Sequence, residues 1–215
     1  MTVANAEVHL RRAYGLIHGV EQQLEQFRSQ MMRHSANVNA DEPFVSGMIT
    51  AFQGSRRIAA EKAALRQDID LAWAEIDRAS QIDSSAKIEA DGTAFDIIAL
   101  RAGANLVAGE LELSSGQFEP AKQCLRQSIE LLDNASAHYM LGLISEEQYN
   151  PTEAVAEFEK CLQLEPDGEL SVRALRDANR MRNYRKQFRG TWGTFGCLLT
   201  VFFPLAFLYY FANRK

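Results

Sequence analysis

The chain has 215 residues, 47% of them hydrophobic and 24% charged, which suits one medium-sized domain with a substantial core and an additional segment. Residues 1–172 carry 14 basic and 27 acidic side chains, whereas residues 173–215 carry nine basic side chains and a single acidic one. The acidic body argues against nucleic acid as a partner, because non-specific binding of that kind depends on Lys and Arg that neutralise phosphates.

Residues 1–34 are predicted to form an amphipathic helix. The segment has early arginines but no uninterrupted apolar run, so it does not have the composition of a secretory signal. Its large apolar residues recur at helical spacing on one face: Val8, Leu16, Val20, Leu24 and Phe27. A loop is expected after about residue 34.

The next part of the chain is also predicted to be helical. A second helical stretch is expected at residues 44–66, and residues 84–92 are interpreted as a polar connector. A long helix is then expected from about Thr93 to Leu113. We find no β-strand pattern in the sequence, so the expected fold class of the body is all-α.

Residues 135–166 have the features of two helices joined by a tight turn. Asn150 can cap the second helix, Pro151 suits its first position, and Glu153 stands where a capping box has an acid. Small residues let two helices approach, an aromatic residue fills the space between them, and a proline ends the second one. Leu141, Gly142, Ala154, Phe158 and Pro166 stand at those places, in the spacing of a tetratricopeptide repeat (TPR). The segment therefore resembles the TPR family, with His138 and Ser145 replacing the usual Trp and Tyr.

A single repeat cannot bury its own apolar face, so neighbouring copies are expected. A step of 33 residues upstream leads to a weaker copy at residues 102–133, with Gly109, Ala121, Ser128 and Leu131 in matching positions. A third trace has Ala72, Ile76 and Ala79 in the spacing of Ala154, Phe158 and Cys161, with residues 58–65 as its first helix and a turn at Asp68–Asp70. The resemblance implies a short helical-hairpin solenoid over residues 44–167.

The end of the sequence differs from the body. Residues 168–190 are predicted to contain a helix that caps the solenoid, with Leu170, Val172, Leu175 and Ala178 on its apolar side, and a basic collar. Residues 191–212 contain no charged side chain and at about 1.5 Å per residue are long enough to span a bilayer core of roughly 30 Å. Interfacial aromatic residues mark the two ends of this predicted transmembrane helix: Trp192, Tyr209 and Tyr210.

The flanking charges predict the orientation. The basic residues before the span outnumber the two that follow it, so the N-terminal body is expected on the cytoplasmic side. The collar is also expected to attract anionic lipid headgroups. It comprises Arg180, Arg182, Arg185, Lys186 and Arg189. Only three residues follow the span, so the chain resembles tail-anchored membrane proteins, although the sequence does not indicate which membrane.

The sequence contains no motif of an enzyme or of a cofactor site. No segment matches a phosphate-binding loop, a zinc-protease helix or a nucleophile elbow. The four histidines are scattered without a second ligand at metal spacing, and Cys124, Cys161 and Cys197 are too far apart for a zinc knuckle or redox pair. We therefore predict a non-enzymatic protein without catalytic, cofactor-binding or metal-binding residues.

The predicted function is that of a membrane-anchored adaptor that binds another protein in the groove of its repeats. Candidate groove residues are Glu110, His138 and Glu146, and the acidic side chains near them favour a basic or amphipathic partner, unless they form only a solvated face. A chaperone-tail clamp is disfavoured because the first helices of the two repeats contain no Lys or Arg. The alternative is an accessory subunit of a membrane complex that packs through Gly193, Gly196 and Thr200. We also consider that the N-terminal helix occupies the groove.

Overall fold

A computed structural model describes residues 3–35 and 56–184 of the chain. Its helices are α1 (Val3–Ser35), α3 (Arg56–Ile82), α4 (Ile97–Ser114), α5 (Phe118–Leu131), α6 (Ala135–Glu147) and α7 (Pro151–Leu164). Residues 169–184 form a further helix. The predicted all-α architecture is confirmed for this part of the chain, apart from one short hairpin formed by β1 (Lys87–Ala90) and β2 (Thr93–Asp96).

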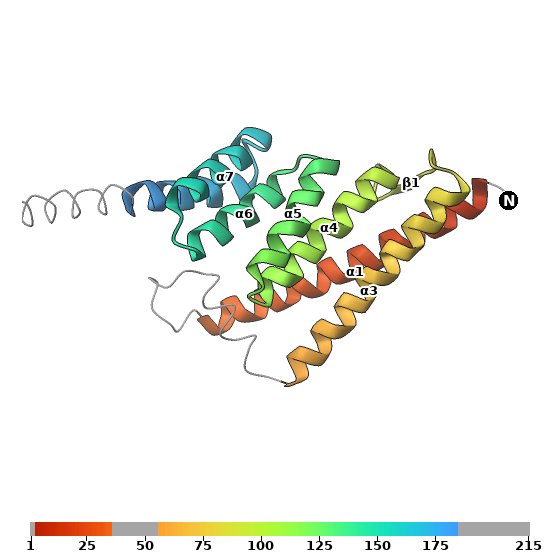
Figure 1. The fold of residues 1–215 in the computed structure, drawn as a ribbon, viewed down its shortest axis with the longest axis horizontal. Helices are drawn as coiled ribbons and strands as arrows, with labels where there is room; N and C mark the ends of the chain where they lie inside the picture. The colour runs from red at the N-terminus through yellow and green to blue at the C-terminus, as the bar shows by residue number, and fades with distance from the viewer. Residues whose placement is uncertain (1–2, 36–55, 185–215) are drawn as a thin grey trace, which may run out of the picture.

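The helices are arranged as consecutive pairs. α1 packs along α3, α4 along α5 and α6 along α7 (Figure 1). Between the pairs, α4 contacts both α1 and α3, and α6 contacts α5 and, to a smaller extent, α4. The core is divided in two, one part formed by α1, α3, the hairpin and α4, the other by α5, α6, α7 and helix 169–184 with the end of α4. The predicted succession of helical hairpins is therefore present, and it forms a short solenoid.

The α6–α7 pair follows the sequence prediction in detail. The side-chain oxygen of Asn150 accepts a hydrogen bond from the Glu153 backbone N–H at 3.3 Å, while its Nδ2 donates to the Glu153 carboxylate at 2.8 Å. Phe158 is fully buried, and a Cβ added to Gly142 would lie only 2.5 Å from its ring. Close approach of the two helices therefore requires glycine at position 142.

The α4–α5 pair repeats that arrangement with smaller side chains. A Cβ added to Gly109 would lie 2.7 Å from Leu125, and Ala121 and Ser128 are fully buried. The buried Ser128 hydroxyl donates to the Ala102 carbonyl at 2.8 Å, so this polar group is satisfied. The register derived from the 33-residue step is therefore confirmed.

The first pair differs from the prediction. α3 is one continuous helix from Arg56 to Ile82, so the turn expected at Asp68–Asp70 is absent, and its partner is α1 rather than residues 58–65. Ala72, Ile76 and Ala79 are fully buried, as their match to α7 predicted. The prediction that Val8 lies on the buried face of α1 is wrong, because this side chain is exposed. That face is a regular series at alternating three- and four-residue steps that includes two alanines: Ala6, Leu10, Ala13, Ile17, Val20 and Leu24.

The segment interpreted as a polar connector is a β-hairpin. Its turn places Asp91 and Gly92 at φ values of 50° and 75°, the left-handed conformations that two-residue hairpin turns require. Ile88 on β1 is buried and pairs with Phe95 on β2. The hairpin ends at Asp96, whose carboxylate caps α4 by accepting from the Ala99 N–H, so α4 begins at Ile97 rather than near Thr93.

The buried face of helix 169–184 agrees only in part with the predicted one, because Leu170 and Ala178 pack against the last pair as predicted. Val172 and Leu175 are exposed, whereas Ala174, Ala178 and Met181 are buried against the last pair. Two of the collar arginines pair with the body, Arg180 with Glu146 at 2.7 Å and Arg182 with Glu159. Among the residues that the structure describes, no helix has the length and apolar character needed to cross a membrane. The predicted span at residues 191–212 lies outside them, as do Arg185, Lys186, Arg189, Trp192, Tyr209 and Tyr210.

Candidate functional site

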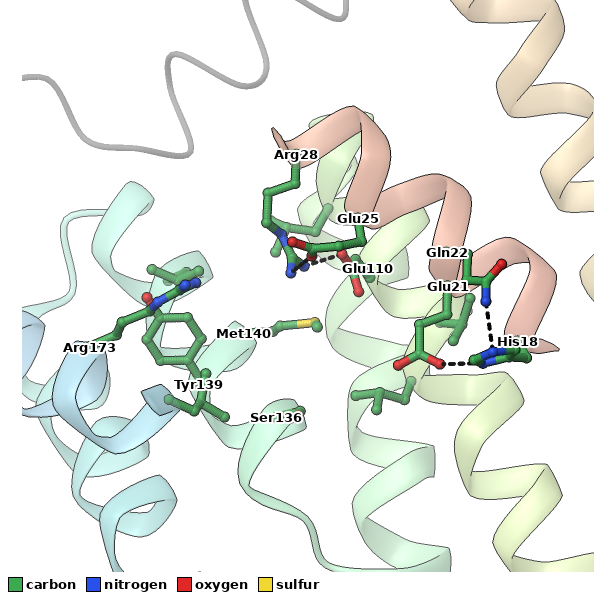
Figure 2. A pocket seen from close by; sticks show the side chains of 15 residues that line it. His18, Glu21, Gln22, Glu25, Arg28, Glu110, Ser136, Tyr139, Met140 and Arg173 are labelled. Atoms are coloured by element: carbon green, nitrogen blue, oxygen red, sulfur yellow. Dashed lines mark hydrogen bonds and ion pairs between the residues drawn. The ribbon is translucent and has the colours of Figure 1, made fainter. Parts of the chain in front are cut away.

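The candidate site is a groove of about 420 Å³ between α1, α4, α6 and helix 169–184. These are the first helices of the three pairs together with the helix that follows them, and their side chains converge on one hollow (Figure 2). The groove residues are His18, Glu21, Gln22, Glu25 and Arg28 of α1, Leu106, Val107, Glu110 and Leu113 of α4, Ser136, Tyr139, Met140 and Leu143 of α6, and Leu170 and Arg173.

The floor of the groove is apolar. Leu106 and Val107 of α4 line it together with Met140 and Leu143 of α6, so two neighbouring pairs contribute apolar side chains. Met140 projects into the middle of the hollow (Figure 2). Methionine is unbranched and polarizable, so it adapts its shape to different apolar partners. The floor is therefore suited to receive apolar side chains.

The edge formed by α1 is acidic. Glu21 and Glu25 are about 60% exposed, and Arg28 binds the carboxylates of both Glu25 and Glu110. Burial raises the pKa of the Glu110 carboxyl, the Arg28 guanidinium opposes that rise, and the charges of Glu21 and Glu25 add to it. Two carboxylates thus share one guanidinium at this edge, and the charge of a third, Glu21, lies close enough to affect Glu110.

The opposite edge is formed by α6 and helix 169–184. The Tyr139 hydroxyl donates to Asp177 at 3.0 Å. Burial together with the Asp177 charge raises the pKa of the Tyr139 hydroxyl. Tyr139 also stacks at a tilt on Phe158, with ring centroids 5.6 Å apart, which fixes it to the α6–α7 core. Arg173 lies beside it and pairs with Glu169 at 2.5 Å. This edge is therefore held firmly by its own internal contacts.

The structure brings only one of the three predicted groove residues to this site. Glu110 lines the groove, whereas Glu146 binds Arg180, and burial raises the pKa of the Glu146 carboxyl against the effect of that guanidinium. His138 is buried between α6 and α7, with Nδ1 2.7 Å from Glu157 and Nε2 2.8 Å from Asp133. His138 is therefore a core histidine with both ring nitrogens in contact with carboxylates, and it does not line the groove as predicted.

The residues of α1 are those that sequence reasoning missed. α1 was expected either as a separate helix or as an occupant of the groove, but it forms one wall of it. Glu21 and Glu25 are four residues apart and therefore share a helix face, a signal that the sequence already contained. Their relevance becomes visible only once α1 is paired with α3.

Outside the groove, two groups have unusual environments. Lys62 donates to the Ser114 carbonyl at 2.9 Å, and burial lowers its pKa to about 8. Burial raises the pKa of the fully buried Cys161 thiol to about 11, so this side chain is a small apolar group of the core rather than a reactive thiolate. In residues 3–35 and 56–184 no group of His, Cys, Asp and Glu side chains has the arrangement of a metal site.

The comparisons with known proteins support one part of the chain. Residues 135–167, which cover α6 and α7, match the tetratricopeptide repeat family. Repeats of this kind are generally non-enzymatic modules that bind other proteins on extended concave surfaces. Neither the curated proteins nor the solved structures contain a match to this chain.

Proposed function

We propose that this protein is a membrane-anchored adaptor that binds another protein in the groove between α1, α4, α6 and helix 169–184. The observation that carries the proposal is the position of the groove. It is lined by the first helix of each pair, including α6 of the segment that matches the repeat family, and repeat solenoids of this type use their concave face for binding. An apolar floor between charged edges is suited to a protein segment.

The anchoring part of the proposal comes from the sequence of residues 191–212. This segment is free of charged side chains over the length of a bilayer core, and the basic residues before it favour a cytoplasmic body. We propose the same division as the sequence suggests, with the N-terminal helix at residues 1–34, the helical repeat domain at 44–167, a cap and collar at 168–190, and the membrane helix at 191–212. Anchoring would raise the local concentration of the groove near its partner, so a weak site would suffice.

A binding experiment tests the groove directly. Ser136 of α6 is half-buried and lines the groove (Figure 2), so Ser136→Trp would place a large ring in it, whereas Gln127→Trp places the same ring on an exposed position of α5 as a control. Proteins that co-purify with the intact chain and with the control, but not with Ser136→Trp, would be groove partners. Partners retained equally by all three proteins would refute the role of this groove.

The alternative, an accessory subunit that assembles through its membrane helix, rests on the small residues Gly193, Gly196 and Thr200. A version that ends at Arg189 separates the two functions. An adaptor keeps its groove partners in that version, whereas a subunit loses them and no longer migrates with a large complex. Washing membranes with alkaline carbonate tests the anchor, because only the version without residues 190–215 should be released.

A further inference from the structure

The α1 edge of the groove has more negative charge than its own cations neutralise. Glu25 and Glu110 share Arg28, and the basic side chain that the described residues place near Glu21 is the imidazole of His18, whose Nδ1 is 3.7 Å away. The charges of Glu21 and Glu25 reach Glu110, where both disfavour the ionised carboxyl. A cation that enters the groove at this edge would therefore relieve repulsion among the three carboxylates.

The geometry of α1 sets the spacing of such cations. Glu21 and Glu25 are one helical turn apart, a rise of about 6 Å, and Figure 2 shows both on the side of α1 that borders the hollow. Two basic residues at positions i and i+4 of a helix have the same separation. A helical partner segment thus matches both carboxylates at once, whereas a single bound cation would not.

The floor determines the other face of the partner. Leu106 is half-buried, Met140 and Leu143 are 9% and 8% exposed, and all three line the same groove as Glu21 and Glu25. Arg173, at the opposite edge, already pairs with Glu169. A segment that covers this floor therefore needs an apolar stripe next to a basic one. That combination is an amphipathic helix, which binds an apolar groove through residues at helical spacing.

We propose that the groove takes an amphipathic helix of another protein, with its apolar face on Leu106, Met140 and Leu143 and two Lys or Arg residues one turn apart opposite Glu21 and Glu25. This inference rests on the proposed protein-binding function of the groove and adds the chemistry of the partner. The acidic edge belongs to α1, outside the segment that matches the repeat family, so the preference for a basic helix is a property of this chain.

Two synthetic helical peptides test the proposal. They share one leucine stripe, and the remaining positions are Lys in the first and Glu in the second; both carry a fluorescent label, and binding to the full-length protein in a nonionic detergent is followed by anisotropy. The Lys peptide is expected to bind at least about tenfold more tightly at low salt, since each exposed ion pair adds up to a few-fold and the Glu peptide is repelled. The difference should shrink at high salt.

The double variant Glu21→Gln/Glu25→Gln assigns the preference to α1. Both residues are exposed, so the fold should be unaffected, and the Lys peptide should bind about fivefold more weakly while the gap between the peptides closes. The control Glu119→Gln/Glu130→Gln removes the same charge from exposed positions of α5 and should leave binding unchanged. All variants are measured in the same detergent, so the fraction of peptide that binds to micelles is the same for each and does not affect the comparison.

The outcomes separate this inference from the function on which it rests. Equal binding of the two peptides, tighter binding of the Glu peptide, or an unchanged preference in Glu21→Gln/Glu25→Gln would overturn the basic-helix partner. If Ser136→Trp still abolished binding of both peptides, the groove would remain a protein-binding site. A wild-type protein that sediments as a dimer, with Glu21→Gln/Glu25→Gln a monomer, would identify a second copy as the occupant and also overturn the inference.

Discussion

Replacing Gly142 with alanine should destabilise the protein although alanine is the better helix former. The added Cβ would lie 2.5 Å and 2.6 Å from two ring carbons of Phe158, distances that real contacts do not reach. The ring is fully buried and packs on Tyr139, so it cannot move aside without disturbing the α6–α7 core. Overpacking of this kind costs roughly 1–3 kcal/mol, with the upper end expected for a confined ring. Subtracting a helix-propensity gain of about 1 kcal/mol leaves a net loss of about 2 kcal/mol.

The measurement is the unfolding of the full-length protein in a nonionic detergent, followed by far-ultraviolet circular dichroism. A loss of about 2 kcal/mol corresponds to a decrease in Tm of about 4–8 °C for a chain of this size. Gly15→Ala is the matched control, because a Cβ at that exposed position of α1 has nothing within 4 Å. It should raise the stability by about 0.5–1 kcal/mol through helix propensity alone.

A double-mutant cycle tests the cause. Phe158→Ala alone should cost about 3–5 kcal/mol, because it removes a buried aromatic ring. In that background the clash is gone, so Gly142→Ala should change sign and stabilise by up to about 1 kcal/mol, which gives a coupling of about 3 kcal/mol. An equal destabilisation in both backgrounds, or no destabilisation in the wild type, would refute the close approach of α6 and α7 as the reason for this glycine.

Three further predictions concern α3 and the hairpin. Although burial raises the pKa of Glu75, the His9 hydrogen bond and charge and the Arg78 guanidinium lower it overall, so the folded state releases this proton more readily. The contacts of Glu75 should therefore stabilise the fold above about pH 4.5, and this contribution should decrease as the pH falls below that value. In denaturant titrations, the free energy of unfolding of the wild type should exceed that of Glu75→Gln by more at pH 7 than at pH 3.5. The same difference at both pH values would contradict this prediction. The rate of acylation of Lys62 should stop rising above about pH 8, whereas the rates at exposed lysines should rise until about pH 10.4. The rates are measured by mass spectrometry of labelled peptides. The same pH profile for Lys62 and for exposed lysines would contradict the effect of burial. Gly92→Ala should cost about 1–2 kcal/mol in the same unfolding assay, since the residue has φ 75°, and a neutral result would argue against the left-handed turn.

The sequence predicts the later part of the solenoid well because its signals are local. Asn150, Pro151 and Glu153 specify where α7 begins, and the contact between Gly142 and Phe158 specifies how α7 packs on α6. The same spacing carried 33 residues upstream yields α4 and α5. Each of these features lies within one contiguous helical hairpin, so it can be predicted without knowing the rest of the fold.

The first pair and the hairpin are harder to predict for physical reasons. The two helices of the first pair, α1 and α3, are separated by residues 36–55, so a search for contiguous hairpins assigns residues 58–65 to a first helix that does not exist. Alanines 6 and 13 are fully buried, yet a search for large apolar residues selects Val8 instead. In the hairpin, Asp91–Gly92 is a turn signal, but each strand has only four residues, and Ile88 is the one residue of the two strands that is well buried. The alternation of apolar and polar residues is therefore too short to predict β-strands here.

A histidine–glutamate contact recurs at the same position in two of the three helical pairs. His138 bridges to Glu157 across the third pair, and His9 bridges to Glu75 across the first, with each glutamate directly before the residue that fills the interhelix space. In the second pair the corresponding positions hold Asn105 and Cys124, and the buried Asn105 Oδ1 is without a hydrogen-bond partner in the described part of the chain.

The first pair is thus interpreted as a divergent copy of the same hairpin, and α1 takes the place of a first helix, with its other face free for the groove. Glu21 and Glu25 lie on that free face, so they are not constrained by the packing that fixes His9 and Ala13. The shape of the site would then follow from the repeated packing of the helical pairs. Its preference among partners would follow from the α1–α3 pair, the copy that has diverged most.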